Sequence, residues 1–384
     1  MKVGIVVPYS WSFWGGVPEH ADHQARALIE LGHDVRLIMG HDPPGRLTKL
    51  LHPREGRHER PPDYVVPVGR SVIVPANGSL PNLILSPPSM LRMSRILDRE
   101  RFDVLHVHEP FAPILSAYAL AVARCPVVAT CHSAGGGMRW YPVGKVCWGV
   151  ISRKIDHRIA VSELARDAAE PYVGGPFEIL PNGVAVPDQL SRWESRRNHV
   201  VFIGRHEPRK GLEVLLRAWP DVARGTGARL RILGADPLSV RWLARRNDVS
   251  LAGVDLLGSV PEEVRTRELL EASVLAAPSL RGESFGMVLM EAFACATPVV
   301  ASSIQGYDRV VEAETGVLVP PGDPAALAAA LVDLLRDEER RRRLGAAGRA
   351  VAEERYSWKR IAGRLVEIYN GLADIPVRES VAVA

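Results

Sequence analysis

The apolar residues of this chain fall into short continuous runs. The first run, residues 2–10, is rich in valine and isoleucine, and similar runs occupy residues 103–108, 126–132, 157–162 and 177–181. A short run without polar alternation is typical of a strand that is buried on both faces of a parallel sheet. Helical patterns separate most of these runs, so the first half of the chain is predicted to be α/β.

The first three elements predict a strand–helix–strand unit. A helix is expected from Pro18 to Leu31, because proline suits a first helical turn and Gly32 suits a helix end. Residues 33–40 follow as the next strand. Residues 41–62 are rich in proline and arginine and are expected to form a loop or lid.

A break in the pattern at residues 182–198 reads as a linker, after which strands and helices alternate again. The predicted fold class is therefore α/β, with two Rossmann-like, doubly wound parallel-sheet domains that face each other across a cleft. The expected domains are residues 1–185 and 186–356. The amphipathic C-terminal segment, residues 357–384, is expected to form a helix that packs back on the first domain.

Composition changes this picture little. The chain has 384 residues, which is long for one core, and its formal charge of +4 is only mildly basic. That charge suits an anionic small molecule or membrane surface, and we expect no nucleic-acid partner. The four cysteines form no CxxC pair, no apolar run reaches a membrane span, and the N-terminus does not resemble a signal peptide. A cytoplasmic location is expected, with peripheral contact to the inner membrane face left open.

Two loops that follow predicted strands carry candidate ligand-binding groups. Gly15 and Gly16 let a backbone approach an anion at a helix N-terminus, although they also fit an ordinary tight turn. The segment GRHEPRKG (204–211) places Arg205 and Lys210 at a strand end, where two cations suit a diphosphate. A solvated basic loop is the alternative. The pattern GxGxxG is absent, which argues against a dehydrogenase.

Histidines mark a second strand end. His132 ends a buried run and is expected at the mouth of the cleft, although a structural histidine is an equal alternative. His106 and His108 alternate along one run and Glu109 follows them, so a metal site is conceivable, but the position of no other residue identifies it as a third ligand beside the two histidines. We therefore expect no metal.

Two glutamates raise the sharpest question. Glu283 precedes a helix expected to begin near Gly286, and Glu291 lies farther along that apolar helix. A favourable charge at a helix N-terminus accounts for Glu283 but not for Glu291. A carboxylate in apolar surroundings needs donors, and a ligand with vicinal hydroxyls would supply them.

Together these features resemble the retaining GT-B glycosyltransferases of family 4, over essentially the whole chain. Within that family the chain is similar to actinobacterial phosphatidylinositol mannosyltransferases. The segments that carry this likeness are residues 63–69, 76–79, 102–110, 128–133, 158–166, 180–184 and 282–292.

The resemblance implies a role for each candidate residue. Arg205 and Lys210 would hold the donor diphosphate, Glu283 would face the sugar, and Glu291 would bind the ribose. The remaining donor contacts would be Gly15, Gly16, Ser284, Phe285 and Gly286. Acceptor contacts would be Tyr9, Asn77, His132 and Ser133. His132, Arg205, Lys210 and Glu283 would be catalytic, without a required metal, because positive side chains stabilise the departing charge.

The resemblance also implies GDP-mannose as donor and phosphatidylinositol as acceptor. This chain departs from the mannosyltransferases at Pro18, where they carry a glutamine, and near Gly137, where they carry a lysine. Arg92, Arg95, Arg99 and Arg101 interleave with apolar residues, which fits either an anionic membrane surface or a solvated helix.

Two rival interpretations stay open. A family 4 enzyme that uses another nucleotide sugar, such as UDP-glucose or UDP-N-acetylglucosamine, would share these residues but act on a different lipid or a soluble acceptor. A protein that binds nucleotide sugars without turnover would be expected to lack a key group, yet none is missing. The sequence leaves the linkage position and oligomeric state open.

Overall fold

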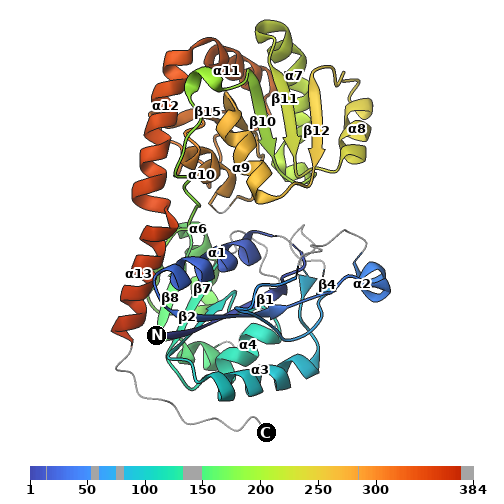
Figure 1. The fold of residues 1–384 in the computed structure, drawn as a ribbon. Helices are drawn as coiled ribbons and strands as arrows, with labels where there is room; N and C mark the ends of the chain where they lie inside the picture. Colours follow the sequence, from blue (N-terminus) through green and yellow to red (C-terminus); the bar gives the residue numbers. More distant parts are fainter. Residues whose placement is uncertain (14, 53–59, 75–81, 133–148, 284, 373–384) are drawn as a thin grey trace. The chain divides into compact units, whose positions relative to one another are not determined.

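The computed structural model describes residues 1–13, 15–52, 60–74, 82–132, 149–283 and 285–372, and the chain divides into two compact units (Figure 1). The first unit comprises Met1–Gly183 and the described part of Trp358–Ala384. The second comprises Val184–Ser357. The assignment of acceptor binding to the first unit and donor binding to the second stays a prediction.

The first unit is built on a parallel sheet of order β3-β2-β1-β6-β7-β8-β9. Its strands are β1 (Lys2–Ser10), β2 (Asp34–Gly40), β3 (Val65–Pro67), β6 (Val104–His108), β7 (Val127–Cys131), β8 (His157–Ala160) and β9 (Glu178–Ile179). The short strands β4 (Val72–Ile73) and β5 (Asn82–Leu83) form an antiparallel pair, and β5 also pairs with β1. The helices are α1 (Gly16–Glu30), α2 (Arg46–Leu51), α3 (Pro87–Glu100), α4 (Leu115–Val122), α6 (Glu163–Val173) and α13 (Trp358–Gly371).

Alternate residues of β1 bury the two faces of this sheet. Val3, Ile5 and Val7 pack in one cluster with α1 and α13, whereas Val6 packs in another with α3 and α4. This follows from the two-residue period of a strand, and it explains why the run shows no polar alternation. Helix α13 returns to the unit where the chain begins, and its Trp358 Nε1 donates to Nδ1 of His23 on α1 at 3.1 Å.

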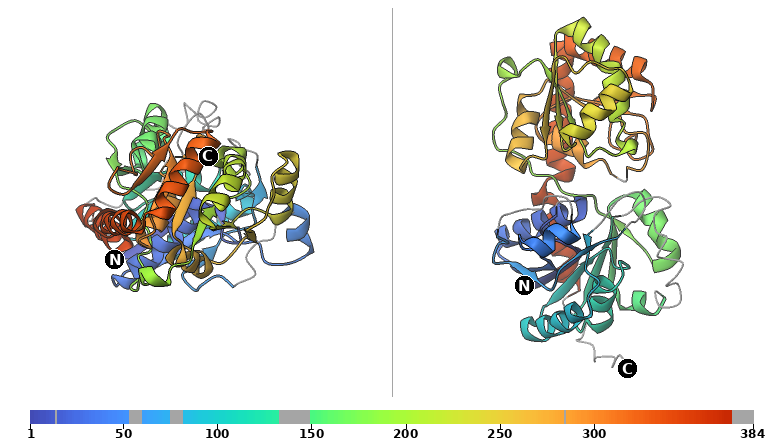
Figure 2. Two further views of the ribbon diagram at one scale, coloured as in Figure 1. Left: turned by 90° about the horizontal axis from the view of Figure 1, so that it is seen from above. Right: turned by 90° about the vertical axis from the view of Figure 1, so that its right-hand side faces the viewer.

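The second unit has six parallel strands in the order β12-β11-β10-β13-β14-β15, the doubly wound Rossmann order. They are β10 (His199–Ile203), β11 (Arg229–Leu233), β12 (Val254–Gly258), β13 (Val274–Ala277), β14 (Val299–Ser302) and β15 (Gly316–Val319). The helices are α7 (Leu212–Thr226), α8 (Pro237–Arg246), α9 (Glu262–Glu271), α10 (Met287–Ala294), α11 (Pro324–Arg336) and α12 (Glu338–Val351). Figure 2 shows helices on both sides of this sheet.

The fold class is confirmed: both units are α/β with parallel sheets. Three local expectations differ from the structure. Helix α1 begins at Gly16 rather than Pro18, the expected loop at residues 41–62 contains α2, and β15 has no counterpart among the predicted strands. The α2 segment, RLTKLL, lacks proline and is rich in good helix formers, which explains that difference. None of the described helices is both long and apolar enough to cross a membrane.

Candidate functional site

In the second unit, the candidate donor groups lie on loops that follow two neighbouring strands. Strand β10 pairs with β13, and the strand order reverses between them. Arg205 and Lys210 follow β10, and Glu283 follows β13. Ligands of open parallel sheets bind outside the carboxyl ends of the strands at such a reversal. The sheet topology therefore brings these three residues to the place where a ligand is expected.

A glycine fixes the geometry of the first loop. Residues Pro208–Lys210 form a single 3-10 turn that ends at Gly211, whose φ of 68° is left-handed. A Cβ at this position would lie 1.8 Å from the carbonyl oxygen of Pro278, beyond the end of β13. Only glycine fits there, so the backbone itself holds Lys210 beside the β13 loop.

Glu283 receives two cations. Lys210 Nζ and Arg209 Nη1 each lie 2.7 Å from its Oε1, and the Glu283 side chain is only 9% exposed. Glu207 in turn pairs with Arg209 at 2.8 Å and with Arg205 at 2.7 Å. Three cations and two carboxylates leave one net positive charge, which suits an anionic ligand.

The sequence prediction named Arg205, Lys210 and Glu283 but missed Arg209 and Glu207. Both lie inside the same GRHEPRKG segment, so the alternation of acidic and basic residues was the available signal. It could not show that Arg209, rather than Lys210 alone, reaches Glu283 from 74 residues away.

The start of α10 also depends on a glycine. Gly286 precedes the helix with a φ of 76°, and a Cβ there would lie 2.8 Å from Cε1 of Tyr307. Phe285 is buried, with its ring edge-on to Tyr356 at 5.4 Å between centroids. These contacts hold the backbone amides at the N-terminus of α10 in place, where they can face an anion. Ser284 lies outside the described residues.

Glu291 has a partner within the protein. Its Oε2 lies 3.2 Å from Nε of Arg265 on α9, and the glutamate side chain is 19% exposed. A ligand is therefore not the only partner available to this carboxylate, because Arg265 forms an ion pair with it. A ribose-binding role stays a prediction, and it requires the carboxylate to accept ligand hydroxyls beside this ion pair.

In the first unit, His132 belongs to a buried group of histidines. It directly follows β7, and its Nε2 lies 2.8 Å from Nδ1 of His108, which ends the neighbouring strand β6. The ring of His20 from α1 stands edge-on to His132 at 4.8 Å. Burial lowers the pKa of His132 to about 3, so its imidazole is neutral near pH 7. The His132 side chain can therefore donate or accept a hydrogen bond, but it does not carry a positive charge near pH 7.

Glu109, which directly follows β6, hydrogen-bonds to the backbone at the end of β7. Its carboxylate accepts the backbone N–H of His132 at 3.1 Å, and its side chain is buried. The backbone of Glu109 is left-handed, with a φ of 47°, a strained conformation for glutamate. Burial, assisted by the Glu109 charge, raises the pKa of Tyr9, so that phenol stays protonated. Strain and a buried charge together mark this loop as a functional candidate.

A second layer connects the histidines to the C-terminal helix. His106 stacks on His108, with 4.7 Å between ring centroids and 5° between planes. Its Nδ1 lies 2.6 Å from the Tyr369 hydroxyl of α13 and 2.9 Å from Nε2 of Gln24. The orientation of His132 therefore depends on residues far along the chain.

The other predicted residues of this unit are less constrained. Gly15 is extended, with a φ of −171°, and among the described residues nothing lies within 4 Å of a Cβ built on Gly16. Neither position requires glycine on steric grounds, and among the described residues no side-chain hydrogen bond caps α1 at Gly15. Asn77 and Ser133 lie outside the described residues.

The histidine group is also the arrangement that a metal ion would use. Ligand atoms of His20, His108 and His132 lie within 4.8 Å of one another. The sequence pattern had instead pointed to His106, His108 and Glu109 as conceivable ligands. Neutral imidazoles are metal ligands, but the short contact between His108 and His132 already uses one nitrogen of each. The absence of a required metal stays a prediction.

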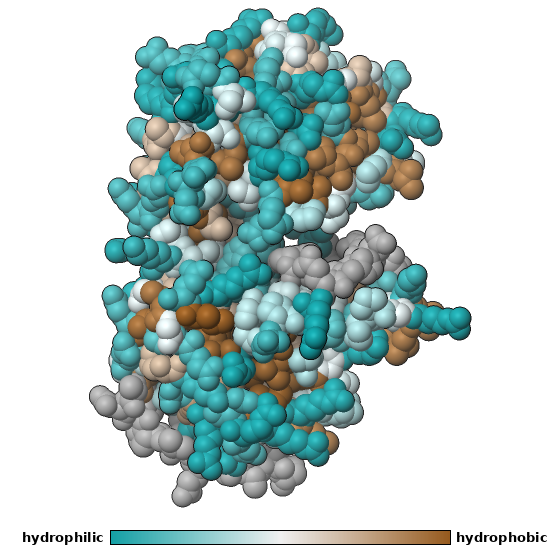
Figure 3. Space-filling model, in the orientation of Figure 1, coloured by the Kyte–Doolittle hydropathy of each residue, from teal (hydrophilic) through white to brown (hydrophobic). Residues whose placement is uncertain are grey.

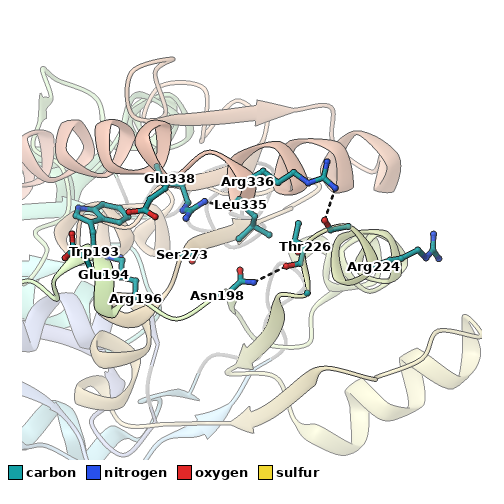
Figure 4. Close-up of a pocket in the computed structure, with 13 residues that line it drawn as sticks. Trp193, Glu194, Arg196, Asn198, Arg224, Thr226, Ser273, Leu335, Arg336 and Glu338 are labelled. Atoms are coloured by element: carbon teal, nitrogen blue, oxygen red, sulfur yellow. Dashed lines mark hydrogen bonds between the residues drawn. The ribbon is translucent and has the colours of Figure 1, made fainter.

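A cavity of about 420 Å³ lies in the second unit at the end of the sheet opposite to the candidate donor loops (Figure 4). Asn198 and Ser273, which line it, precede β10 and β13, so the cavity adjoins the amino ends of the strands. Its arginines are already engaged. Arg196 donates to the carbonyls of Leu269, Ala272 and Cys295 at the ends of α9 and α10, and Arg341 to the last carbonyls of α11. These contacts are helix caps, so the cavity needs no ligand to explain it.

Comparison with known proteins identifies the family. Residues 14–186 match the model for glycosyltransferase family 4, and residues 197–337 match that for glycosyl transferases group 1. A phosphatidyl-myo-inositol mannosyltransferase of Mycobacterium leprae is 38% identical, over 97% of both chains. A GDP-mannose-dependent alpha-(1-6)-phosphatidylinositol monomannoside mannosyltransferase of Mycolicibacterium smegmatis is 29% identical, over 75% of this chain and 82% of its own.

Solved structures agree on the fold. Sucrose-phosphate synthase from Thermosynechococcus elongatus superposes with a TM-score of 0.73 at 20% identity, covering 97% of this chain and 98% of its own. Anabaena Alr3699/HepE, in a complex with UDP-glucose, gives 0.70 at 18% identity, covering 97% and 100%.

Proposed function

This chain belongs to the family 4 glycosyltransferases, and we propose that it transfers a mannosyl group from GDP-mannose to phosphatidylinositol with retention of configuration. The observation that carries the proposal is the 38% identity to a phosphatidyl-myo-inositol mannosyltransferase along nearly the whole of both chains. Family membership makes the protein a hexosyltransferase with a nucleotide-sugar donor. The particular donor and acceptor are the finer part of the proposal.

On the donor side, Arg205 and Lys210 hold the diphosphate. As the bond between the sugar and the diphosphate breaks, negative charge grows on the leaving group, and these cations stabilise it. Arg209 also contacts Oε1 of Glu283, at 2.7 Å, so Glu283 keeps its position when Lys210 turns toward a phosphate. Glu283, with the amides of Phe285 and Gly286, then faces the sugar.

On the acceptor side, the inositol hydroxyl attacks the anomeric carbon on the face from which GDP departs. The new glycosidic bond forms as the bond to the diphosphate breaks, and the hydroxyl proton passes to a diphosphate oxygen. His132 donates or accepts a hydrogen bond as a neutral imidazole beside the reacting sugar, held by His108 at 2.8 Å. Tyr9, Asn77 and Ser133 complete the proposed acceptor contacts.

A UDP-sugar remains the second candidate donor. A structural neighbour solved in complex with UDP-glucose shares the fold. Pro18 and Gly137 replace a glutamine and a lysine expected in inositol phosphate recognition, which favours testing other acceptors as well.

Turnover by the purified full-length protein tests the proposal. GDP-mannose, UDP-glucose and UDP-N-acetylglucosamine are each supplied with vesicles that contain or lack phosphatidylinositol, and nucleotide release is measured. We expect release from GDP-mannose that depends on phosphatidylinositol. Release from a UDP-sugar alone would retain the family and reject the donor, and release that ignores the lipid would reject the acceptor.

A further inference from the structure

Helix α8 of the second unit carries two exposed apolar side chains on its outer face. Leu238 is 72% exposed and Trp242 is 56% exposed, although both are large hydrophobic residues. The inner face of the same helix is buried through Val240, Leu243 and Ala244. Figure 3 shows hydrophobic residues at the surface of the second unit in the region of this helix. The outer residues are therefore not needed for the core.

Positive charge surrounds these apolar residues. Arg241, Arg245 and Arg246 are exposed, and α8 contains no acidic residue. The Arg246 guanidinium lies 5.4 Å from the centre of the Trp242 ring, and none of the three arginines has an ion-pair partner within the described part of the chain. Residues 238, 241, 242 and 245 follow the i, i+3, i+4, i+7 spacing, so apolar and basic side chains share one helical face.

Helix α3, for which the sequence left membrane contact open, is less suited to it. On α3, Leu91 is 63% exposed, but Arg99 pairs with Glu100 at 2.6 Å and Arg92 donates to a backbone carbonyl at 3.3 Å. Asp98 lies on the same helix and pairs with Arg124. Arg95 and Arg101 are exposed and have no ion pair among the described residues, so what distinguishes the helices is the two acidic residues of α3, Asp98 and Glu100, which α8 lacks.

We propose that the outer face of α8, defined by Leu238, Arg241, Trp242, Arg245 and Arg246, docks on an anionic lipid surface. Tryptophan and leucine enter the boundary between headgroups and acyl chains, and flanking arginines meet lipid phosphates. Charge complementarity selects the lipid: a cationic helix with an apolar ridge matches an anionic headgroup layer over acyl chains. The helix is short, so docking is reversible. This inference does not depend on which sugar or acceptor the enzyme uses.

Vesicle binding by the full-length protein tests this surface. The wild type and the double variant Leu238→Ser/Trp242→Ser are sedimented with phosphatidylcholine vesicles and with mixed phosphatidylcholine and phosphatidylglycerol vesicles. We expect the wild type to bind the mixed vesicles, and the double variant to bind them roughly tenfold more weakly, since it loses both interfacial side chains. Leu190→Ser, at another exposed leucine, is the matched control and should bind like the wild type.

Charge is tested separately. Arg241→Gln/Arg245→Gln/Arg246→Gln should weaken binding, and added salt should weaken wild-type binding in the same way. Arg192→Gln/Arg224→Gln/Arg343→Gln removes equal charge elsewhere on the second unit and should have little effect. Equal binding by the wild type and the α8 variants would overturn the proposal. So would α8 variants that alter only self-association in sedimentation velocity, because the face would then be a protein contact.

Discussion

Lys210 and Arg209 converge on one carboxylate oxygen, Oε1 of Glu283, each at 2.7 Å. The carboxylate comes from a loop more than 70 residues away, and the sheet order makes the two loops neighbours. Lys210 is thereby preorganised for an anionic ligand. A diphosphate can bind Lys210 while Arg209 continues to neutralise the charge of Glu283. The predictions on donor chemistry follow from this relationship.

Lys210→Ala should reduce turnover more than donor affinity. The charge on the leaving diphosphate is largest in the transition state, so loss of this cation should lower kcat by about 10² to 10³-fold. Steady-state kinetics and donor titration calorimetry measure the two effects. The control is Lys359→Ala, at an exposed lysine of α13. Equal losses in affinity and in rate would contradict the role.

Glu291→Gln should mainly weaken donor binding. An amide accepts hydrogen bonds from ribose hydroxyls less strongly than a carboxylate does, so the dissociation constant should rise roughly tenfold. Arg265→Gln separates the two functions of Glu291, because it removes the ion pair but leaves the carboxylate. It should change donor affinity less. If calorimetry finds the affinity of Glu291→Gln unchanged, the ribose assignment fails.

The buried histidines should make stability depend on pH. Burial lowers the pKa of His132 to about 3 and holds those of His20 and His108 well below 6.5, whereas unfolded histidines titrate near 6.5. The unfolded chain therefore binds more protons below about pH 6.5, and stability is lost as the pH falls from there toward about 3. Each histidine adds at most about 1.4 kcal/mol per pH unit.

Urea unfolding between neutral pH and about pH 4 measures this dependence. His108→Gln removes one buried imidazole and should flatten the slope. A slope identical to that of the wild type would show that His108 does not titrate on unfolding.

Chelators should leave turnover unchanged. Cationic side chains stabilise the leaving group in this account, and the closest nitrogens of His108 and His132 contact each other at 2.8 Å. Assays after dialysis against EDTA or phenanthroline measure the requirement. Activity lost on chelation and restored by a divalent ion would instead assign His20, His108 and His132 as metal ligands.

Gly211→Ala should destabilise the second unit. The new Cβ would meet the Pro278 carbonyl oxygen at 1.8 Å on a left-handed backbone, which should cost about 2–4 kcal/mol. Gly363→Ala is the matched control, because it lies within α13 and, among the described residues, nothing is within 4 Å of its Cβ. Thermal unfolding should show a loss for the first variant and none for the second.

The sequence was sufficient for the fold class, because continuous apolar runs mark buried parallel strands, but it did not reveal α2 or β15. It also placed Arg205 and Lys210 at a strand end, because they follow such a run, and it placed Glu283 just before the helix that begins near Gly286. It could not show the Arg265–Glu291 ion pair, which depends on how α9 packs against α10. The stack of His106 on His108 and the contact to Tyr369 depend in the same way on strand geometry and on the return of α13. Local patterns predict elements, whereas partners distant in the chain require the packed structure.

The most direct test of the central claim is the structure of the lipid product. The protein is incubated with GDP-mannose and phosphatidylinositol vesicles, and the extracted lipid is analysed by mass spectrometry and by NMR of the anomeric carbon. The account predicts a phosphatidylinositol that carries one added mannosyl residue in the α configuration, and at least about a hundredfold less of it with Lys210→Ala at matched protein concentration and reaction time. A β-linked product, or an unmodified lipid while GDP-mannose is consumed, would contradict it.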